Sequence, residues 1–572
     1  MSPYEHLPTS GPKPTSDADA GLPDHIQSLL NKYDVTSNGF LPEGPPLELL
    51  PDEYYAPWEE LIRRLPESLD AGIFREEVDT LPVLETSRLK REEEWRRAYV
   101  VLCFFAHGYI WGGSRPSEVL PPSISLPLLS VSSHLSLPPI ATYASLNLWN
   151  FRCVAPPSTS QSLPPSPPLT PASSTPSLPS TTQAKTADKK FDPTDLSRLR
   201  TLHTFTGTPS ESWFYLVSVA MEAQGAYIIP VMLRALQAIS LRSESWKEIT
   251  TKALRELVTC VEAVGELLER MYERCEPMVF YHQIRPFLAG SKGMSAVGLP
   301  RGVFYDLGPA GGEEGEEGDT EVVRGEKRKG KWMAYRGGSN GQSSLIQFWD
   351  LVLGVEHVSH GNSSPHSSSS SSSSNPGNTA TKTTEQKDPP FHEEVRSYMP
   401  LPHRQFLSLV SRMGPGGGGK GGGIRKAITE MVATAHQQAR ELTKEEMEVQ
   451  EAFTEATRAL ARFRDLHLKI VARYIVIPSR QKVPEEFRSR GEKRDGVVNL
   501  ASVSSGLHER GDNGMGDEGG KEGGGEGGGW KEGGKEGGKE GGKELTGTGG
   551  TALLPFLKQT RDETLRAGEV GR

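Results

Sequence analysis

Cysteine is scarce in this chain of 572 residues, and the few thiols are far apart. They are Cys103, Cys153, Cys260 and Cys275, and none forms a C-x-x-C pair. This spacing excludes the dense disulfide framework of small secreted domains and the paired cysteines of structural zinc sites. The cysteine usage therefore favours a protein of the reducing cytoplasm.

Long apolar runs and an excess of positive charge are also lacking. No stretch reaches the roughly 18 continuous apolar residues of a transmembrane helix, because prolines interrupt the most apolar region, 120–148. The polar start, MSPYEHLPTSGPKPTSDADA, has neither the basic beginning nor the apolar centre of a secretory signal. The formal net charge of -9 gives no general attraction to nucleic acid. We expect a cytoplasmic protein with neither nucleic-acid nor membrane partners.

Glycine and proline are abundant but lie mostly in a few biased tracts. Such tracts have too few large apolar side chains to offset the entropy of ordering, so they predict disordered inserts. The inserts are 153–193, about 309–330, about 358–388, about 413–424 and 481–545. The other segments predict an all-α protein. Its parts are a flexible leader over 1–45, a small helical domain over 46–152, a large helical domain over 194–480 and a C-terminal piece over 546–572.

The clearest helical pattern runs from about Glu441 to Pro478. Apolar side chains recur there at alternating four- and three-residue steps, which place them on one face of an α-helix. That face consists of Val449, Phe453, Ala456, Leu460, Phe463, His467, Ile470 and Tyr474. Acidic residues gather at the start and basic residues at the end, and Pro478 predicts the stop. His467 is therefore predicted to face a core.

A histidine on an apolar face has two interpretations. The commoner one is a buried histidine that is hydrogen-bonded to a backbone carbonyl. The other is the single axial ligand of a haem iron, a neutral imidazole held in an apolar slot. His107, in an apolar helix predicted over 88–111, competes as a ligand, although the neighbouring Gly108 favours a core histidine. Spacing alone does not decide between these interpretations.

A series of segments resembles the successive signature segments of the indoleamine 2,3-dioxygenase family. They are LPPIATYASLNLWNF, SWFYLVSVAMEA, PMVFYHQIRPFLAG, YRGGSNGQSSLIQFWDLVLGVEH, VRSYMPLPHRQFL, RDLHLKIVARYIVIPSR and GTGGT. In addition, LPDEYYAPWEELIRRLPE and VLCFFAHGYIWGG resemble the small domain of that family. The resemblance implies that 194–480 is a catalytic haem-binding domain, and that 546–572 holds an active-site loop and a C-terminal helix.

The resemblance also implies how haem is held. The family segment R-x-x-H-L-x-I-V-x-x-Y-I-x-I-P carries the proximal ligand, which here is His467, so haem b with ferrous iron is expected. Cys275, as a thiolate, is the main competitor, but it matches no ligand position of the family. The loop beside the haem propionates is matched by Gly337, Gly338 and Ser339, and a charged pair at the haem edge by Asp350 and Arg464.

On the substrate side, four residues match pocket-lining positions of the family: Tyr143, Phe214, Ser218 and Phe280. Aromatic walls suit a flat indole ring, and a small hydroxyl leaves space for dioxygen. Ser218 is a candidate catalytic residue, although a serine is too weak to serve as the base. A departure from the family is that Tyr215 and Tyr281 stand where phenylalanine is common; if either faces the pocket, its hydroxyl would change the polarity there.

Two further matches concern the amino-acid part of the substrate. Arg285 matches the family arginine that binds the carboxylate, a role suited to a planar guanidinium, whereas the residue alone fits a surface ion pair equally well. The mobile loop that closes over the substrate is matched by Gly547, Thr548 and Gly549, with Thr548 offering a hydroxyl. By itself, a glycine-threonine run is a weak signal.

The resemblance implies a monomeric enzyme that inserts both atoms of O2 across the indole C2–C3 bond of L-tryptophan. The product is N-formylkynurenine, the first intermediate of the kynurenine pathway, and an electron donor keeps the haem reduced. Two other classes stay open: a haem protein that binds or senses oxygen without turnover, and a low-activity paralogue that signals through partners. Arg285 and the loop at Gly547 argue against an oxygen carrier, because oxygen binding alone needs no amino-acid clamp.

Overall fold

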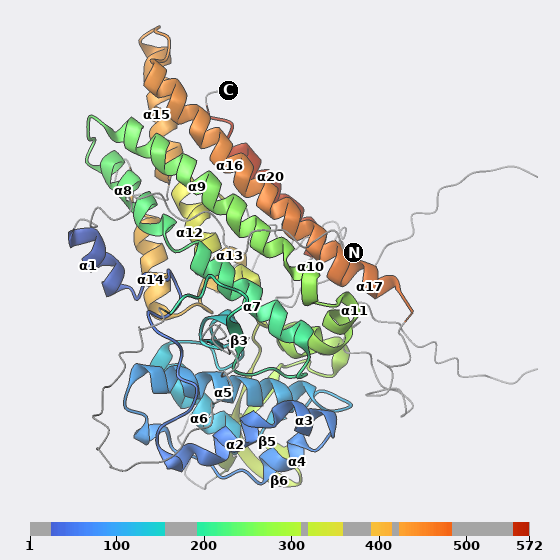
Figure 1. The fold of residues 1–572 in the computed structure, drawn as a ribbon. Coiled ribbons are helices and arrows are strands. Elements are labelled where there is room, and N and C mark those ends of the chain that lie inside the picture. The colour runs from blue at the N-terminus through green and yellow to red at the C-terminus, as the bar shows by residue number, and fades with distance from the viewer. Residues whose placement is uncertain are drawn as a thin grey trace, which may run out of the picture.

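The computed structural model describes residues 24–154, 191–310, 319–357, 391–414, 422–482 and 553–570. These residues are mostly helical and form an upper and a lower body in the view of Figure 1. The predicted helical class is thereby confirmed in its main part. Within the described ranges, no single helix is long and apolar enough for a membrane span. Two consecutive helices, α7 (Pro209–Gln224) and α8 (Ile228–Ser240), pass that test only as a pair bent by 41°.

The lower body surrounds one apolar helix, α5 (Glu92–Trp111), whose side chains are all buried from Arg97 to Trp111. A helix without a polar face has to be enclosed by other elements. The enclosing elements are η2 (Glu53–Tyr55), α2 (Ala56–Arg63), α3 (Leu65–Asp70), α4 (Phe74–Asp79), η3 (Thr86–Arg88) and α6 (Pro122–Leu135). We call the core of this body the lower cluster; it includes Phe104, Tyr143, Phe280 and Tyr474.

The upper body is built on two long helices, α9 (Trp246–Glu269) and α16 (Lys444–Val471), which lie side by side in Figure 1. Around them pack α1 (Asp24–Lys32), α7 (Pro209–Gln224), α8 (Ile228–Ser240), α12 (Ser344–Leu353), α13 (Phe391–Arg396), α14 (Leu401–Val410), α15 (Gly423–Gln437) and α20 (Leu553–Ala567). We call the core of this body the upper cluster; it includes Leu257, Trp349, Phe406 and Phe463.

Short turns connect the two bodies. They include α10 (Met271–Arg274), α11 (Pro277–Val279), η6 (Arg285–Leu288), η7 (Ser295–Val297) and η8 (Asn340–Gln342). Three of the turns are π-helical, namely η4 (Ala144–Leu148), η5 (Phe280–Ile284) and η9 (Ala472–Val476). Turns of this kind are rare and often lie at functional sites. Each of the three contains or directly follows one of the aromatic residues described below.

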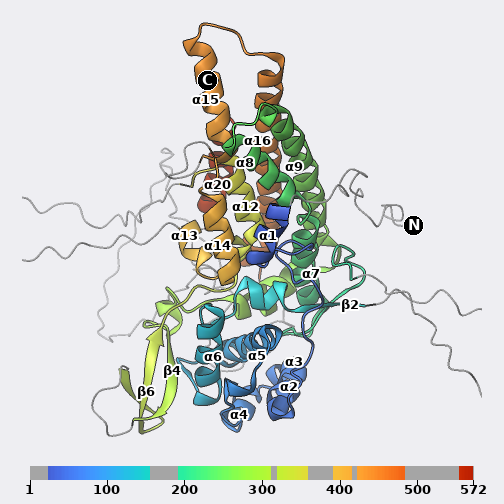
Figure 2. The same ribbon diagram turned by 90° about the vertical axis from the view of Figure 1, so that its left-hand side faces the viewer.

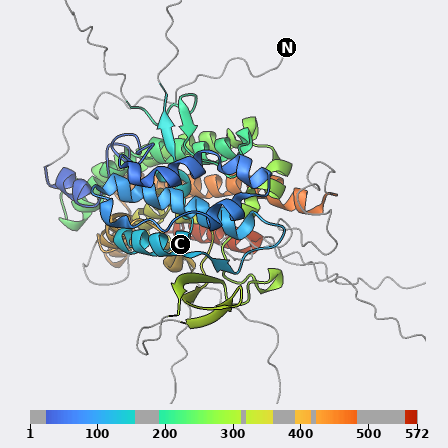
Figure 3. The ribbon, with the colours of Figure 1, turned by 90° about the horizontal axis from the view of Figure 1, so that it is seen from below.

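The prediction of a purely α-helical fold is wrong in two places, each of which holds a small sheet. A four-stranded sheet with the order β1-β4-β6-β5 flanks the lower body, where Figures 2 and 3 show it to one side of the helices. Its strands are β1 (Val119–Leu120), β4 (Val303–Pro309), β5 (Asp319–Val323) and β6 (Glu326–Met333). The insert predicted over about 309–330 is therefore wrong for 319–330. A second small sheet pairs β2 (Phe151–Cys153) with β3 (Leu199–Thr201).

The flexible leader predicted over 1–45 is also wrong for residues 24–45. Ile26 and Leu30 of α1 are buried in the upper cluster, as are Val35 and Phe40 after the helix. The burial of these side chains stabilises a segment that is too short to be a stable helix alone. Residues 1–23, and all or most of the inserts predicted at 153–193, 358–388, 413–424 and 481–545, lie outside the described residues.

The predicted helix around His467 is confirmed. Thr443 and Glu446 form a capping box at the start of α16, and the predicted apolar face is buried from Val449 to Phe463. The stop at Pro478 is wrong, because the chain continues through η9 into α17 (Ile477–Arg480). Pro478 stands in the first turn of α17, where the missing N–H of proline costs little.

Candidate functional site

His467 lies where the two cores meet. Phe463, one turn earlier on α16, belongs to the upper cluster, whereas Val471 and Tyr474 belong to the lower cluster. The imidazole is half-buried and accepts or donates no hydrogen bond among the described residues. Burial, and secondarily the charge of Arg464, lowers the pKa of His467 to about 4. At neutral pH the ring is therefore uncharged, with a lone pair available.

Neither competing ligand is suited to bind iron. The Nδ1 atom of His107 lies 2.6 Å from the carbonyl oxygen of Phe287, and its Nε2 accepts a hydrogen bond from the N–H of Ala141 at 3.1 Å. His107 is fully buried, so it is the satisfied core histidine that was expected. Burial raises the pKa of the Cys275 thiol to about 12, which disfavours the thiolate that a metal requires.

These observations fit a haem held by one imidazole. The only uncommitted imidazole of the three potential ligands discussed is that of His467, which stands on a helix between two apolar clusters. Among the described residues, no group of three or more His, Cys, Asp or Glu side chains could hold a bare metal ion. A metal at His467 would therefore need a ligand frame of its own, which a porphyrin provides.

An aromatic group extends from the same helix. The ring of Phe280, in η5, lies with its centroid 5.8 Å from that of Tyr474 in η9. On its other side Phe280 meets Phe214 of α7, with centroids 4.9 Å apart. Phe214 is half-buried and Phe280 is nearly buried. The structure thus brings two of the three predicted aromatic lining residues, Phe214 and Phe280, together, next to the helical segment that carries His467.

Tyr143 and Ser218 meet in a buried polar group that includes Glu222. The hydroxyl of Ser343 donates to Oε1 of Glu222 at 2.6 Å, and the Tyr143 phenol interacts with Glu222, Ser218 and Ser343. The N–H of Tyr143 donates to Gln342 at 2.9 Å. Burial raises the pKa of Glu222 to about 7.

Glu222 was not predicted from the sequence. Its position one turn after Ser218 on α7 is the signal that could have indicated it, because residues four apart share a helix face.

The two tyrosines that depart from the family pattern differ in their surroundings. The hydroxyl of Tyr215 donates to Oε1 of Glu211 at 3.0 Å, and both residues are fully buried. This hydroxyl is therefore directed along its own helix toward Glu211. Tyr281 is also buried, and the guanidinium carbon of Arg285 lies 5.7 Å from the centroid of its ring.

Arg285 is completely buried at the start of η6. The alternative of a surface ion pair is therefore wrong. Burial lowers the pKa of Arg285 to about 10, opposed by the nearby Tyr281. A guanidinium so deep in the protein still carries its charge at neutral pH, and it stabilises any anion brought to it more strongly than a surface arginine would.

The glycine loop packs tightly against neighbouring backbone. A Cβ on Gly337 would lie 2.0 Å from the carbonyl oxygen of Leu288, and one on Gly338 would lie 2.5 Å from a methyl carbon of Leu146. Ser339 caps η8 by accepting a hydrogen bond from the N–H of Gly341 at 3.2 Å. The loop therefore requires glycine at position 337, where the clash is with backbone, whereas at position 338 the Leu146 side chain would have to move.

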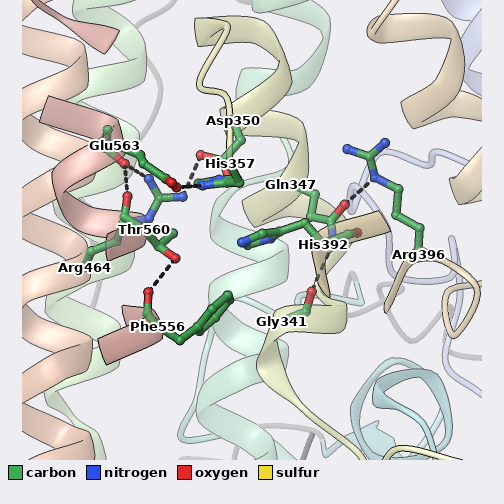
Figure 4. Close-up of polar contacts among 11 residues, drawn as sticks. Gly341, Gln347, Asp350, His357, His392, Arg396, Arg464, Phe556, Thr560 and Glu563 are labelled. Atoms are coloured by element: carbon green, nitrogen blue, oxygen red, sulfur yellow. Dashed lines mark hydrogen bonds and ion pairs between the residues drawn. The ribbon is translucent and has the colours of Figure 1, made fainter. Parts of the chain in front are cut away.

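Asp350 and Arg464 form the predicted charged pair, with Nη2 of Arg464 2.6 Å from Oδ1 of Asp350 (Figure 4). Arg464 also donates to the hydroxyl of Thr564 on α20. Burial alone would raise the pKa of Asp350, but Arg464 and His357 lower it overall. The predicted loop residues Gly547, Thr548 and Gly549 lie outside the described residues.

Comparison with known proteins gives a consistent result. The sequence pattern of the family described as indoleamine 2,3-dioxygenase matches residues 29–567. Indoleamine 2,3-dioxygenase qulI of Penicillium citrinum is 33% identical over 95% of this chain and 90% of its own length. The indoleamine 2,3-dioxygenase of Saccharomyces cerevisiae is 32% identical over 95% and 94%. The 6-hydroxytryptophan 2,3-dioxygenase fscD of Fusarium equiseti is 33% identical over 80% and 87%.

Proposed function

This chain belongs to the indoleamine 2,3-dioxygenase family and is a dioxygenase, and on that premise we propose that it opens the indole ring of L-tryptophan to give N-formylkynurenine. The reaction would use haem b and insert both atoms of O2 across the C2–C3 bond. The observation that carries the proposal is the neutral, uncommitted imidazole of His467 between the two apolar clusters. We propose His467 as the iron ligand.

When bound, the haem would supply the activation of dioxygen, and the protein would supply position and exclusion of water. Phe214 and Phe280 present aromatic faces and edges against which an indole ring can pack. Arg285 would bind the substrate carboxylate from a buried position, where a charge-assisted hydrogen bond is strong. Ser218 would leave room beside the indole without acting as a base.

Other residues would hold the edge of the cofactor. The charged pair of Arg464 and Asp350 stands one helical turn before His467, and Gly338 and Ser339 would lie beside the propionates. Gly547, Thr548 and Gly549 would close over the amino acid. This role rests on the resemblance of the GTGGT segment and on its place just before α20.

A ring-hydroxylated tryptophan is the second candidate substrate. The relative from Fusarium equiseti is named for 6-hydroxytryptophan. In the present chain, Tyr143, Glu222 and Ser218 form a buried polar group beside the aromatic wall, and such a group could accept a hydrogen bond from a ring hydroxyl. Tryptophan remains the first candidate because the relatives from Penicillium and Saccharomyces carry the general family name.

Turnover by the purified full-length protein tests this proposal. The protein is loaded with haem, kept reduced and supplied with oxygen, and N-formylkynurenine is followed by absorbance and mass spectrometry. L-tryptophan and 6-hydroxytryptophan are compared by kcat/KM. Reversible oxygen binding without product from either amino acid would contradict the proposal and favour an oxygen-binding protein. A very low rate with both would favour the signalling paralogue.

A further inference from the structure

One buried imidazole connects two helices that are far apart in the sequence. His357 follows α12, and its Nε2 lies 3.2 Å from Oδ2 of Asp350 on that helix. Its Nδ1 lies 2.7 Å from Oε2 of Glu563 on α20. Figure 4 shows the ring between the two carboxylates. We call Asp350, His357, Arg464 and Glu563 the clasp.

The clasp is almost closed to solvent. The side chains of His357, Asp350 and Glu563 are 10%, 8% and 6% exposed, and that of Arg464 is 9% exposed. Two carboxylates at this depth need two positive charges nearby, because an unbalanced buried charge is strongly destabilising. Arg464 supplies one charge. Protonated His357, which contacts both carboxylates, supplies a second.

With Asp350 and Glu563 both ionised, both ring nitrogens of His357 donate. A neutral imidazole carries one N–H, whereas an imidazolium carries two, and ionised carboxylates only accept. Burial alone would lower the pKa of His357, but Asp350 and Glu563 outweigh it and raise the pKa overall. His392 stacks on His357 with ring centroids 4.0 Å apart, and burial together with the charge of His357 lowers the pKa of His392 to about 3. The neighbouring ring therefore stays neutral.

The clasp reaches the helix of His467 through Arg464. Thr564 follows Glu563 on α20 and accepts a hydrogen bond from Arg464, while Arg464 also binds Asp350. Fixing Glu563 therefore fixes Thr564 against the guanidinium. A second pair between α20 and α16, Arg561 with Asp465 at 2.8 Å, is partly exposed and contributes little.

We propose that His357 is a positioning residue whose imidazolium form clasps α20 to α12 and thereby orients Arg464, one turn before His467. The part that concerns the iron ligand rests on the proposed function. The clasping of α20 does not, because its contacts lie within the protein.

The clasp makes the docking of α20 depend on pH. The folded chain binds the proton of His357 more tightly than the unfolded chain does, so the stabilising contribution is complete below the ordinary pKa of about 6.5. It is lost as pH rises through the higher pKa of the folded protein. Among the described residues, the charged or titratable groups that face His357 include Asp350, Glu563, Arg464 and His392, and His357 is the one whose pKa is raised from the neutral range.

Hydrogen exchange of residues 553–567 tests the clasp in the full-length protein. The variant His357→Gln keeps a hydrogen-bonding side chain without the charge. At pH 6, we expect protection of α20 to fall at least about tenfold relative to the unchanged protein, with α9 as the internal reference. The double variant His357→Gln/Glu563→Gln removes the unbalanced carboxylate, so it should recover most of the protection.

The matched control is His134→Gln. His134 also pairs with a glutamate, Glu92, at 3.0 Å, but the two side chains are 40% and 50% exposed. A surface pair of this kind contributes little, so α20 should keep its protection. In the unchanged protein, protection of α20 relative to α9 should fall as pH rises from 6 to 9.

Two results would overturn the clasp: unchanged protection of α20 in His357→Gln at pH 6, or no recovery in the double variant. If His357→Gln does not fold, the proposal is tested by the pH series on the unchanged protein. Protection of α20 relative to α9 that stays constant from pH 6 to pH 9 would contradict the proposal. Haem retention by gel filtration, followed at the Soret band, tests the link to His467. Loss of the clasp should weaken retention, and retention equal to that of His134→Gln would contradict the link.

These results are distinct from a failure of the proposed function. If hydrogen exchange of α20 behaves as the clasp predicts but the protein does not turn over tryptophan, the proposed function is contradicted and the clasp is not. If the protein turns over tryptophan but the hydrogen-exchange protection of α20 does not change with pH, the clasp is contradicted and the proposed function is not.

Discussion

Phe280 packs edge-on against Tyr474, with ring centroids 5.8 Å apart and ring planes at 90°. Tyr474 stands two helical turns after His467, and its hydroxyl donates to the carbonyl oxygens of Met271 and Cys275 at 3.1 and 2.8 Å. One tyrosine thus joins the aromatic wall, the turn at α10 and the helix of the candidate ligand. A change at Tyr474 would therefore be felt on both sides of the proposed site.

Replacing His467 with alanine should abolish stable haem binding. The expected readout is the loss of the normal Soret band after reconstitution with haem, because alanine offers no lone pair to the iron. The control is His107→Gln, which should keep the Soret band but lower the free energy of unfolding by about 1–3 kcal/mol, because buried hydrogen-bonding groups lose their partners. An unaltered spectrum in His467→Ala would show that another residue binds iron.

Replacing Arg285 with alanine should weaken substrate binding more than it slows the chemical step. Removing a charge-assisted hydrogen bond costs roughly 1.5–3 kcal/mol, so KM should rise by about 10- to 100-fold with a smaller change in kcat. Arg285→Lys keeps the positive charge but lacks the planar guanidinium, so its KM should lie between that of the unchanged enzyme and that of Arg285→Ala. A KM equal to that of the unchanged enzyme would remove Arg285 from the site.

Glu222→Gln should flatten the pH dependence of stability between about pH 4.5 and 7. In the folded chain, burial raises the pKa of Glu222 to about 7, so the folded state holds a proton that the unfolded state has already lost. Stability therefore falls as pH rises through this range, by on the order of 3 kcal/mol at most. Urea unfolding at pH 5 and pH 8 measures the difference, and an equally steep dependence in the variant would contradict the assignment.

Gly337→Ala should destabilise the protein, because the new Cβ would lie 2.0 Å from the carbonyl oxygen of Leu288 and neither backbone can yield. Overpacking of this kind typically costs about 1–3 kcal/mol. Gly341→Ala is the matched control, since its nearest contact would be 3.4 Å from the ring of Phe391. Thermal unfolding of both variants is the measurement. Equal melting temperatures would show that the loop moves to accept the methyl group.

The sequence predicted what depends on periodicity. The face of α16 and the burial of α5 follow from local patterns of apolar residues, and both are observed. The hairpin of β5 and β6 was not predicted, because its many charged and polar residues resemble those of a disordered insert. Arg324 and Gly325 both have positive φ, as a two-residue type I′ turn requires. Gly325 was the one residue in the sequence that indicated this turn.

Contacts between distant segments could not be predicted from one sequence. His357 and Glu563 are separated by 206 positions, and nothing in either local pattern indicates the other. Glu222 and Ser343 are separated by 121 positions and meet only because α7 and α12 pack near one another. The roles of His467 and Arg285 came from the family resemblance, since their residue types alone fitted a core histidine and a surface ion pair.

The upper cluster contains both Ile26, near the beginning of the described chain, and Val570, near its end. During synthesis on the ribosome, the core of the upper body therefore has to wait for α20 and the residues that follow it before all of its described members are present. Closing contacts of such long sequence separation is slow, because the entropy of a very large loop is lost before the contacts form. The nascent chain would expose its apolar helices in the meantime, which makes chaperone binding during translation an expected part of its maturation.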